Sequence, residues 1–328
     1  MVRVVVATCL AALVGAAVLG LLAGDTWLLT GDVANWLTGR AGPAVSYVLD
    51  QRHPRVLAAL LAGAALAVAG TAVQAVCRNP LAEPGILGVT AGAGVGAVAL
   101  LSYAPLAGIW AMSGVAGLAA LLTFAAVYAL VWRTGLNSDR LVLVGIGVYT
   151  AGTAIITLII IATDPWNTGK ALTWLSGSTY GRTAAQVAPV ALALLAITPA
   201  LAAASRRLDL LALDDDTPRL LGIRLERTRL LVLAAAALLT STAVSAVGVI
   251  AFVGLVAPHA ARALVGGRHR RVLPVAALLG AVLVSLADTL GRTAIAPAQI
   301  PAGLVTAMIG TPYFAWLLWR SRVRPTGP

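Results

Sequence analysis

Long apolar runs alternate with short polar segments along almost the whole chain. A helix needs about 20 mostly apolar residues to cross the hydrocarbon core of a membrane. Ten runs reach or approach that length, and we predict a spanning helix in each; they cover residues 4–22, 56–76, 86–104, 108–132, 141–162, 184–204, 230–250, 251–265, 272–290 and 300–319. The eighth run is short and contains Pro258, which predicts a kinked or broken helix.

The composition supports a single all-α membrane domain over residues 1–328. Hydrophobic residues make up 60% of the chain and charged residues 11%, whereas charged residues make up about 25% of a soluble domain. Ten spans with short loops leave no room for a separate soluble catalytic domain. The first run would also suit a signal peptide, but it is long for one and nine runs follow it, so we expect a retained helix.

The basic residues predict the orientation of the chain in the membrane. The net charge of +11 does not indicate a nucleic-acid-binding face, because the basic residues lie in loops between apolar runs. With the N-terminus inside, 17 of the 23 basic residues fall on the cytoplasmic side. The outer loops hold only six: Arg40, Arg52, Arg55, Lys170, Arg182 and Arg292. The positive-inside rule therefore places both termini in the cytoplasm, which requires an even number of spans.

Residue patterns of enzymes and cofactor sites are missing from the sequence. Gly169-Lys170 is followed by Ala171 and lacks the upstream glycine of a phosphate-binding loop. His53, His259 and His269 lie far apart without metal-ligand spacing. We therefore do not expect an enzyme, and we expect that the chain binds no metal or cofactor directly.

The small and charged residues within the predicted spans are interpreted as structural residues that pack or form ion pairs inside the protein. Cys9 and Cys77 are far apart in apolar runs and are predicted to pack as small residues. Asp288 is the main charge within a span, and we predict that it pairs with Arg292 four residues later. Five glycines are predicted to allow close contact between helices: Gly63, Gly70, Gly92, Gly94 and Gly96.

Three long motifs carry a resemblance to a known family. They are NPLAEPGILG at residues 79–88, GVIAFVGLVAPH at residues 248–259 and IPAGLVTAMIGTPYF at residues 300–314. These segments resemble the permease subunits of ABC importers for ferric siderophores, haem and cobalamin. The resemblance extends from about Arg52 to Trp319. Two local departures are Gln299, where the family often has an acid, and Arg268, where it often has Asp.

The resemblance implies a type II ABC importer permease in the cell membrane, with ten transmembrane helices per subunit. Two permease subunits are expected to pair around a central pathway in the lipid bilayer. Two cytoplasmic ATPase subunits would bind ATP and Mg²⁺, and an extracytoplasmic substrate-binding protein would dock outside. We expect no nucleic-acid partner.

The resemblance also assigns roles to individual residues. Arg52, Arg55 and Arg292 would receive the binding protein, with interfacial snorkelling as the alternative. Asn79, Leu81, Asn137 and Ser138 would narrow the cytoplasmic end of the pathway, with loop capping as the alternative. The 208–222 segment would be the coupling segment that contacts the ATPase, with an interfacial amphipathic helix as the alternative; its proposed contact residues are Leu213, Asp214, Asp215, Asp216, Leu220, Leu221 and Gly222. The sequence Asp216-Thr217-Pro218 followed by Gly222 predicts a short helix there.

Several questions remain open at the level of sequence. We expect a ferric-siderophore-type iron chelate as the substrate, with haem or cobalamin as the alternative. A secondary carrier that needs no ATPase is a competing hypothesis of a different class. The sequence does not decide between a homodimer and a heterodimer, and it does not identify the binding protein or the residues that contact the substrate.

Overall fold

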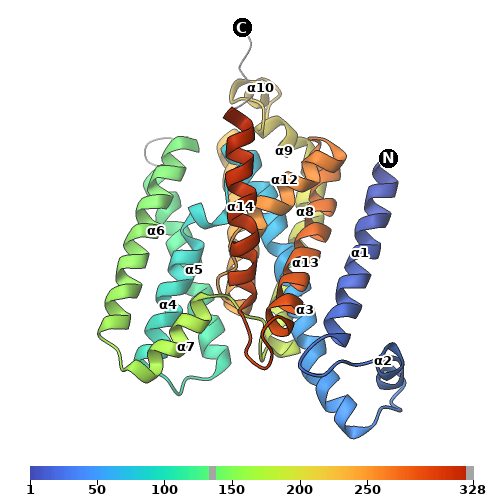
Figure 1. The fold of residues 1–328 in the computed structure, drawn as a ribbon. Coiled ribbons are helices and arrows are strands. Elements are labelled where there is room, and N and C mark those ends of the chain that lie inside the picture. Colours follow the sequence, from blue (N-terminus) through green and yellow to red (C-terminus); the bar gives the residue numbers. More distant parts are fainter. Residues whose placement is uncertain (133–137, 323–328) are drawn as a thin grey trace.

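The computed structural model describes residues 1–132 and 138–322, and this part of the chain forms helices with no strand. The helices run roughly side by side as a bundle (Figure 1). Each of the ten predicted apolar runs contains one long helix: α1 (Val2–Leu22), α3 (Pro43–Cys77), α4 (Val89–Tyr103), α5 (Ile109–Trp132), α6 (Ser138–Ile161), α8 (Ala184–Ala203), α11 (Leu225–Val247), α12 (Val253–Val265), α13 (His269–Thr293) and α14 (Ala302–Arg322).

Seven of these helices are long and apolar enough to cross a membrane, and three more apolar helices are shorter. The seven are α1, α3, α5, α6, α8, α11 and α13, while the shorter three are α4, α12 and α14. The connecting segments contain further short helices: α2 (Thr30–Leu37), η1 (Pro84–Leu87), α7 (Pro165–Leu175), α9 (Ser205–Leu211) and α10 (Asp216–Leu220).

Helix α3 begins well before the position that the sequence predicted. The predicted span starts at residue 56, but the helix starts at Pro43 and continues through Pro54. Arg52 and Arg55 therefore lie inside a helix and not in the loop before it, which corrects the prediction. Hydropathy locates only the start of the apolar run. The helix extends further toward the N-terminus because the charged side chains before that run find partners within the fold.

Helix α12 continues through Pro258, where the sequence predicted a kink or break, and the chain is instead interrupted just before the helix. Residues 248–252 are not helical, and both Gly248 and Phe252 have left-handed backbone, with φ of +78° and +69°. The side chain of Glu83 accepts a hydrogen bond from the Phe252 N–H at 3.0 Å. This contact joins the break to the segment that connects α3 with η1.

Helix α3 forms the centre of the bundle and packs against α11, α12 and α13. A Cβ atom at Gly63 would collide with the carbonyl oxygen of Gly280, and one at Gly70 with the carbonyl oxygen of Gly254. The predicted close helix packing at these glycines is confirmed. Both free cysteines, Cys9 and Cys77, are buried.

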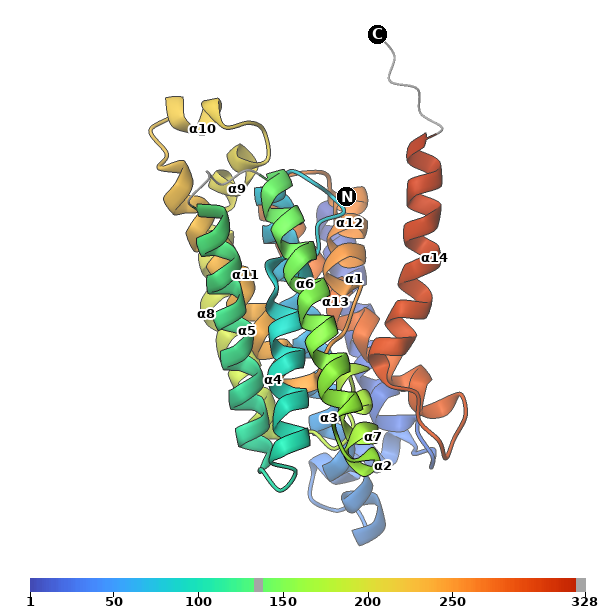
Figure 2. The same ribbon diagram turned by 90° about the vertical axis from the view of Figure 1, so that its left-hand side faces the viewer.

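The two ends of the bundle carry different connecting helices. The start of α1, the end of α14 and the short helices α9 and α10 lie at one end, whereas α2 and α7 lie at the other (Figures 1 and 2). We call these the α10 end and the α2 end. The arrangement places the coupling segment far from Arg52, Arg55 and Arg292.

Candidate functional site

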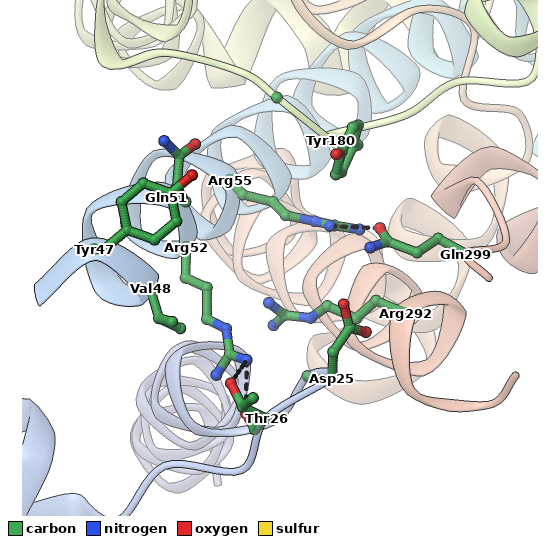
Figure 3. Close-up of a pocket in the computed structure, with 12 residues that line it drawn as sticks. Asp25, Thr26, Tyr47, Val48, Gln51, Arg52, Arg55, Tyr180, Arg292 and Gln299 are labelled. Atoms are coloured by element: carbon green, nitrogen blue, oxygen red, sulfur yellow. Dashed lines mark hydrogen bonds between the residues drawn. The ribbon is translucent and has the colours of Figure 1, made fainter. Parts of the chain in front are cut away.

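The three arginines predicted to receive a binding protein line one open cavity at the α2 end. Its volume is about 470 Å³, and Arg52 and Arg55 reach it from α3 while Arg292 reaches it from α13 (Figure 3). The exposed rings of Tyr47 and Tyr180 line the same cavity. The structure thus brings together residues that are 240 positions apart in sequence.

Arg52 is fixed to the end of α1. Its guanidinium donates hydrogen bonds to the carbonyl oxygens of Leu21 at 3.0 Å, Leu22 at 3.1 Å and Thr26 at 2.7 Å. The last carbonyls of a helix lack partners within the helix, and a cation is favourable beside them. Arg52 therefore stabilises the C-terminus of α1 from a neighbouring helix.

Arg55 forms a two-point ion pair with Asp288. Its Nε lies 3.0 Å from Oδ2 and its Nη2 lies 2.9 Å from Oδ1 of the carboxylate. Its Nη1 donates to the side-chain oxygen of Gln299 at 2.8 Å, and the Thr179 hydroxyl also donates to Asp288. Gln299, the neutral residue at a position where an acid was anticipated, thus serves as a further acceptor for the arginine.

The predicted ion pair between Asp288 and Arg292 is present, but Arg55 is the closer partner of Asp288. The Arg292 Nε lies 4.0 Å from the nearer oxygen of Asp288, whereas Arg55 approaches within 2.9 Å. Helices α3 and α13 cross here and deliver Arg55 from another part of the chain, which a local i,i+4 spacing does not reveal. Arg292 instead donates to the carbonyl oxygen of Gly20 and, at 3.4 Å, to the Thr289 hydroxyl.

All three arginines are buried within the chain, with side chains that already have partners. Arg52 and Arg55 are each 8% exposed and Arg292 is 2% exposed. This burial was not expected, because the sequence placed the three arginines in outer loops where they would be exposed to a binding protein. The three arginines nevertheless line the same open cavity as the exposed rings of Tyr47 and Tyr180. The docking role stays a prediction.

The predicted cytoplasmic gate is only partly within the described residues. The Asn79 side chain accepts a hydrogen bond from the Leu81 N–H at 2.9 Å, which stabilises the turn after α3. Asn137 lies outside the described residues, and Ser138 begins α6, without a described side chain. We call residues 78–88 the gate link. The capping hydrogen bond between Asn79 and Leu81 is observed, and the gating role of the link stays a prediction.

The coupling segment contains the short helix that the sequence predicted. Helix α10 begins at Asp216, and Gly222 follows it with φ of +75°. The Asp214 carboxylate accepts hydrogen bonds from the backbone N–H and the hydroxyl of Thr217 at 2.6 and 2.8 Å, and these bonds hold the pKa of Asp214 below its usual value. Three leucines of the segment are exposed, at 64% for Leu213, 87% for Leu220 and 63% for Leu221, whereas Leu208 and Leu211 are buried in the core.

Asp215 faces the bundle, between Arg78 and Arg229. Partial burial acts to raise the pKa of Asp215, but hydrogen bonds from the two guanidinium groups outweigh it and hold the pKa below its usual value. A carboxyl with a lowered pKa keeps its charge at every pH above that range and loses it only as the pH falls through the lowered value. The contact is therefore ionic throughout the physiological range.

Comparison with known protein families identifies the class to which this chain belongs. The model of the FecCD transport family matches residues 11–320. The chain belongs to the FecCD transport family. It is therefore a membrane permease of the ABC iron-siderophore importer family.

Individual relatives in this family differ in the substrate that their names record. The Fe(3+) dicitrate permease FecD of Escherichia coli is 40% identical over 290 residues, covering 86% of this chain and 88% of FecD. The vitamin B12 permease BtuC of Citrobacter koseri is 38% identical over 309 residues, covering 94% of this chain and 91% of BtuC. A solved metal-chelate-type ABC transporter in an inward-facing conformation has a TM-score of 0.85 at 28% identity, and the match covers 97% of this chain and 99% of the other.

Sequence reasoning on this FecCD-family chain missed several site residues. Asp288 was expected to pair with Arg292 and not with Arg55, Thr179 was not assigned to the site, and Asp215 was assigned only to contact with the ATPase. A usable signal existed for Asp288, because opposite charges in two apolar helices, here Arg55 and Asp288, favour pairing inside a membrane protein. No comparable signal existed for Thr179, which lies in a loop between α7 and α8.

Proposed function

We propose that the chain is the transmembrane permease subunit of an ATP-driven importer that moves ferric-siderophore-type iron chelates into the cytoplasm. The match of the FecCD family model to residues 11–320 carries this proposal. Iron uptake is the function named for FecD among the relatives, but BtuC, a vitamin B12 permease, is almost equally similar. A cobalamin or haem chelate is therefore the second candidate substrate.

In this proposal all ten long helices cross the membrane, and both termini face the cytoplasm. The charge distribution supports the orientation, since 17 of 23 basic residues fall on the side assigned to the cytoplasm. The start of α1 and the end of α14 share the α10 end, as an even number of crossings requires. The three shorter helices α4, α12 and α14 are counted as crossings because they are apolar and pack among the seven longer spans.

The α2 end would receive the loaded binding protein. The acidic side chains of its two lobes would enter the cavity lined by Arg52, Arg55 and Arg292. Because these arginines already have partners within the chain, a docking carboxylate would share or replace acceptors instead of meeting free cations. We expect such contacts to control orientation and association rate more than complex stability.

The α10 end would receive two ATPase subunits, which bind ATP and Mg²⁺. The exposed leucines of the coupling segment are suited to an apolar groove on such a partner. A second permease subunit, identical or related, would complete the pathway. The nucleotide cycle would then supply the free energy that changes the opening of the pathway, since a ligand that binds both states equally shifts neither.

Uptake by whole cells distinguishes the candidate substrates. Cells that carry or lack this chain, together with its ATPase and binding protein, are given radiolabelled ferric siderophore, haem or cobalamin. We expect chain-dependent accumulation of the ferric siderophore. Accumulation of cobalamin or haem alone would support the second candidate, and uptake that persists without the ATPase would support a secondary carrier.

A further inference from the structure

Three consecutive carboxylates precede or begin α10, and their surroundings differ. Asp214 caps α10 through Thr217, and the side chain of Asp216 is 90% exposed with Arg219 as its nearest cation at 3.8 Å. Asp215 alone is turned into the bundle, where two arginine side chains donate to its carboxylate. Asp214 therefore caps the helix locally, Asp216 is a solvent-exposed charge, and Asp215 makes a tertiary contact.

The two arginines belong to different long helices. Arg229 lies in the second turn of α11, its side chain is 4% exposed, and its Nη2 lies 2.6 Å from the Asp215 Oδ1. Arg78 is the residue that ends α3, and its Nη2 donates to the same oxygen. The Asp215 carboxylate thus bridges two cations from α3 and α11, and Glu226 lies 3.8 Å from Arg229 as a second, more distant anion. We call Asp215, Arg78 and Arg229 the Asp215 cluster.

Arg78 connects this cluster to the gate link through its own backbone. It has φ of +51°, a left-handed conformation that glycine or asparagine adopts more readily at a helix end. Its Nε donates to the carbonyl oxygen of Leu211, the last residue of α9, at 2.9 Å. The side chain of Arg78 is therefore fixed on the coupling segment, while Asn79 and Leu81 follow directly in the chain.

A second carboxylate of the coupling segment provides a comparison. Asp209 accepts hydrogen bonds from the backbone N–H of His269 at 2.8 Å and lies 2.6 Å from its Nδ1. This contact ties α9 to the start of α13, which does not continue into the gate link. Asp209 and Asp215 both anchor the segment, but only Asp215 contacts the residue that starts the gate link.

We propose that the Asp215 cluster transmits movement of the coupling segment to the gate link, which makes Asp215 a positioning residue of the transport cycle. The inference rests on the proposed function, in which the coupling segment contacts an ATPase and the gate link closes the pathway. Two short connections carry the movement: Asp215 to the Arg78 guanidinium, and the Arg78 backbone to Asn79. A change at α10 therefore reaches residue 81 without passing through the bundle core.

The test measures gate accessibility and ATP hydrolysis in the same preparation. The assembled transporter with its ATPase subunits carries Leu81→Cys in a Cys9→Ala, Cys77→Ala background, and the rate of maleimide labelling is measured with and without a non-hydrolysable ATP analogue. Nucleotide should change the labelling rate when Asp215 is present. If nucleotide does not change the labelling rate when Asp215 is present, the gating role of the gate link, which belongs to the proposed function, is contradicted. That result would be distinct from a failure of the role proposed for Asp215.

With Asp215→Asn we expect the nucleotide-dependent change in labelling rate to fall by about tenfold, within the usual range of allosteric coupling. ATP hydrolysis should continue, since no residue of the ATPase is altered. Asp215→Glu should restore most of the response because it retains the carboxylate. Asp209→Asn makes the same charge change at the other anchor of the segment and should keep the response.

Arg78→Gln gives an independent test if Asp215→Asn fails to assemble, because the Arg229–Asp215 ion pair survives in it. We expect the same loss of nucleotide response with continued ATP hydrolysis. A normal response in either Asp215→Asn or Arg78→Gln would overturn the proposal. An equal loss in Asp209→Asn would also overturn it, since any anchor of the segment would then suffice.

Discussion

Asp288 is the buried counter-ion in the group of three arginines at the α2 end. It forms the two-point ion pair with Arg55, and its side chain is 3% exposed while that of Arg55 is 9% exposed. Removing one partner of a buried ion pair leaves an uncompensated charge, whereas replacing both partners by apolar residues is often neutral. The stability of this end therefore depends on the pair as a unit.

We predict that Asp288→Asn destabilises the protein by about 3–5 kcal/mol, because Arg55 would remain buried without a counter-ion. Thermal unfolding in detergent checks this value. The double variant Asp288→Leu with Arg55→Met should recover much of the loss, and Asp50→Asn, whose carboxylate bonds to Trp36 at the surface, provides the control. An unchanged melting temperature for Asp288→Asn would show that the pair contributes nothing.

Arg52 provides the clearest test of binding-protein docking, because its partners are backbone carbonyls and not another charge. We predict that Arg52→Gln slows association of the binding protein at low ionic strength and that the effect fades as salt is added. Stopped-flow or surface-based kinetics would measure it. Arg40→Gln removes the same charge from an exposed loop at the same end and should have little effect. Equal rates for Arg52→Gln and the parent protein would show that Arg52 only stabilises the end of α1.

At the scale of helices, close contact between small residues sets the packing around α3. Gly63 and Gly70 each lie against a carbonyl of a neighbouring helix, in α13 and α12 respectively. Backbone atoms do not rotate aside as a flexible side chain does. Each contact therefore fixes the separation of two helices.

We predict that Gly63→Ala destabilises the protein by about 1–3 kcal/mol, because the added methyl group overlaps the Gly280 carbonyl. Gly147→Ala is the matched control in α6, where nothing lies within 4 Å of the added Cβ; it should be neutral or stabilise by up to about 1 kcal/mol through helix propensity. Both variants are compared by thermal unfolding. Equal losses for the two would show that glycine flexibility, and not close packing, matters at residue 63.

The positions of the long helices were largely predictable from the sequence, because burial in lipid imposes long apolar runs. All ten predicted runs contain a helix, but the break lies at residues 248–252 and not at Pro258, which α12 includes. The start of α3 at Pro43 and the helices α2, α7 and α9 were not predicted, since they are short or mixed in polarity. The α10 helix was predictable because its start and stop residues carry local signals.

The site was less predictable than the helices. The sequence motifs and the family resemblance named Arg52, Arg55 and Arg292, and the structure brings them to one cavity. Their partners were not predictable, because Arg55 and Asp288 are 233 residues apart and meet only where α3 crosses α13. For the same reason the inward orientation of Asp215 depends on Arg78, which is 137 residues away.

At the scale of the whole molecule, the orientation in the membrane follows from charge. We predict that the α10 end faces the cytoplasm and the α2 end faces outward. In right-side-out vesicles, Leu29→Cys should react with a membrane-impermeant maleimide from outside, and Leu221→Cys should react only after permeabilisation. Both side chains are exposed, at 74% and 63%. The opposite pattern would invert the assigned topology.

The central claim is that this permease imports an iron chelate at the expense of ATP. Purified permease, its ATPase subunits and the binding protein are reconstituted in proteoliposomes, with radiolabelled ferric siderophore outside and ATP with Mg²⁺ inside. The account predicts accumulation that requires the binding protein and stops when ATP is replaced by a non-hydrolysable analogue. Accumulation without ATP, driven by a proton or sodium gradient through the permease alone, would contradict it.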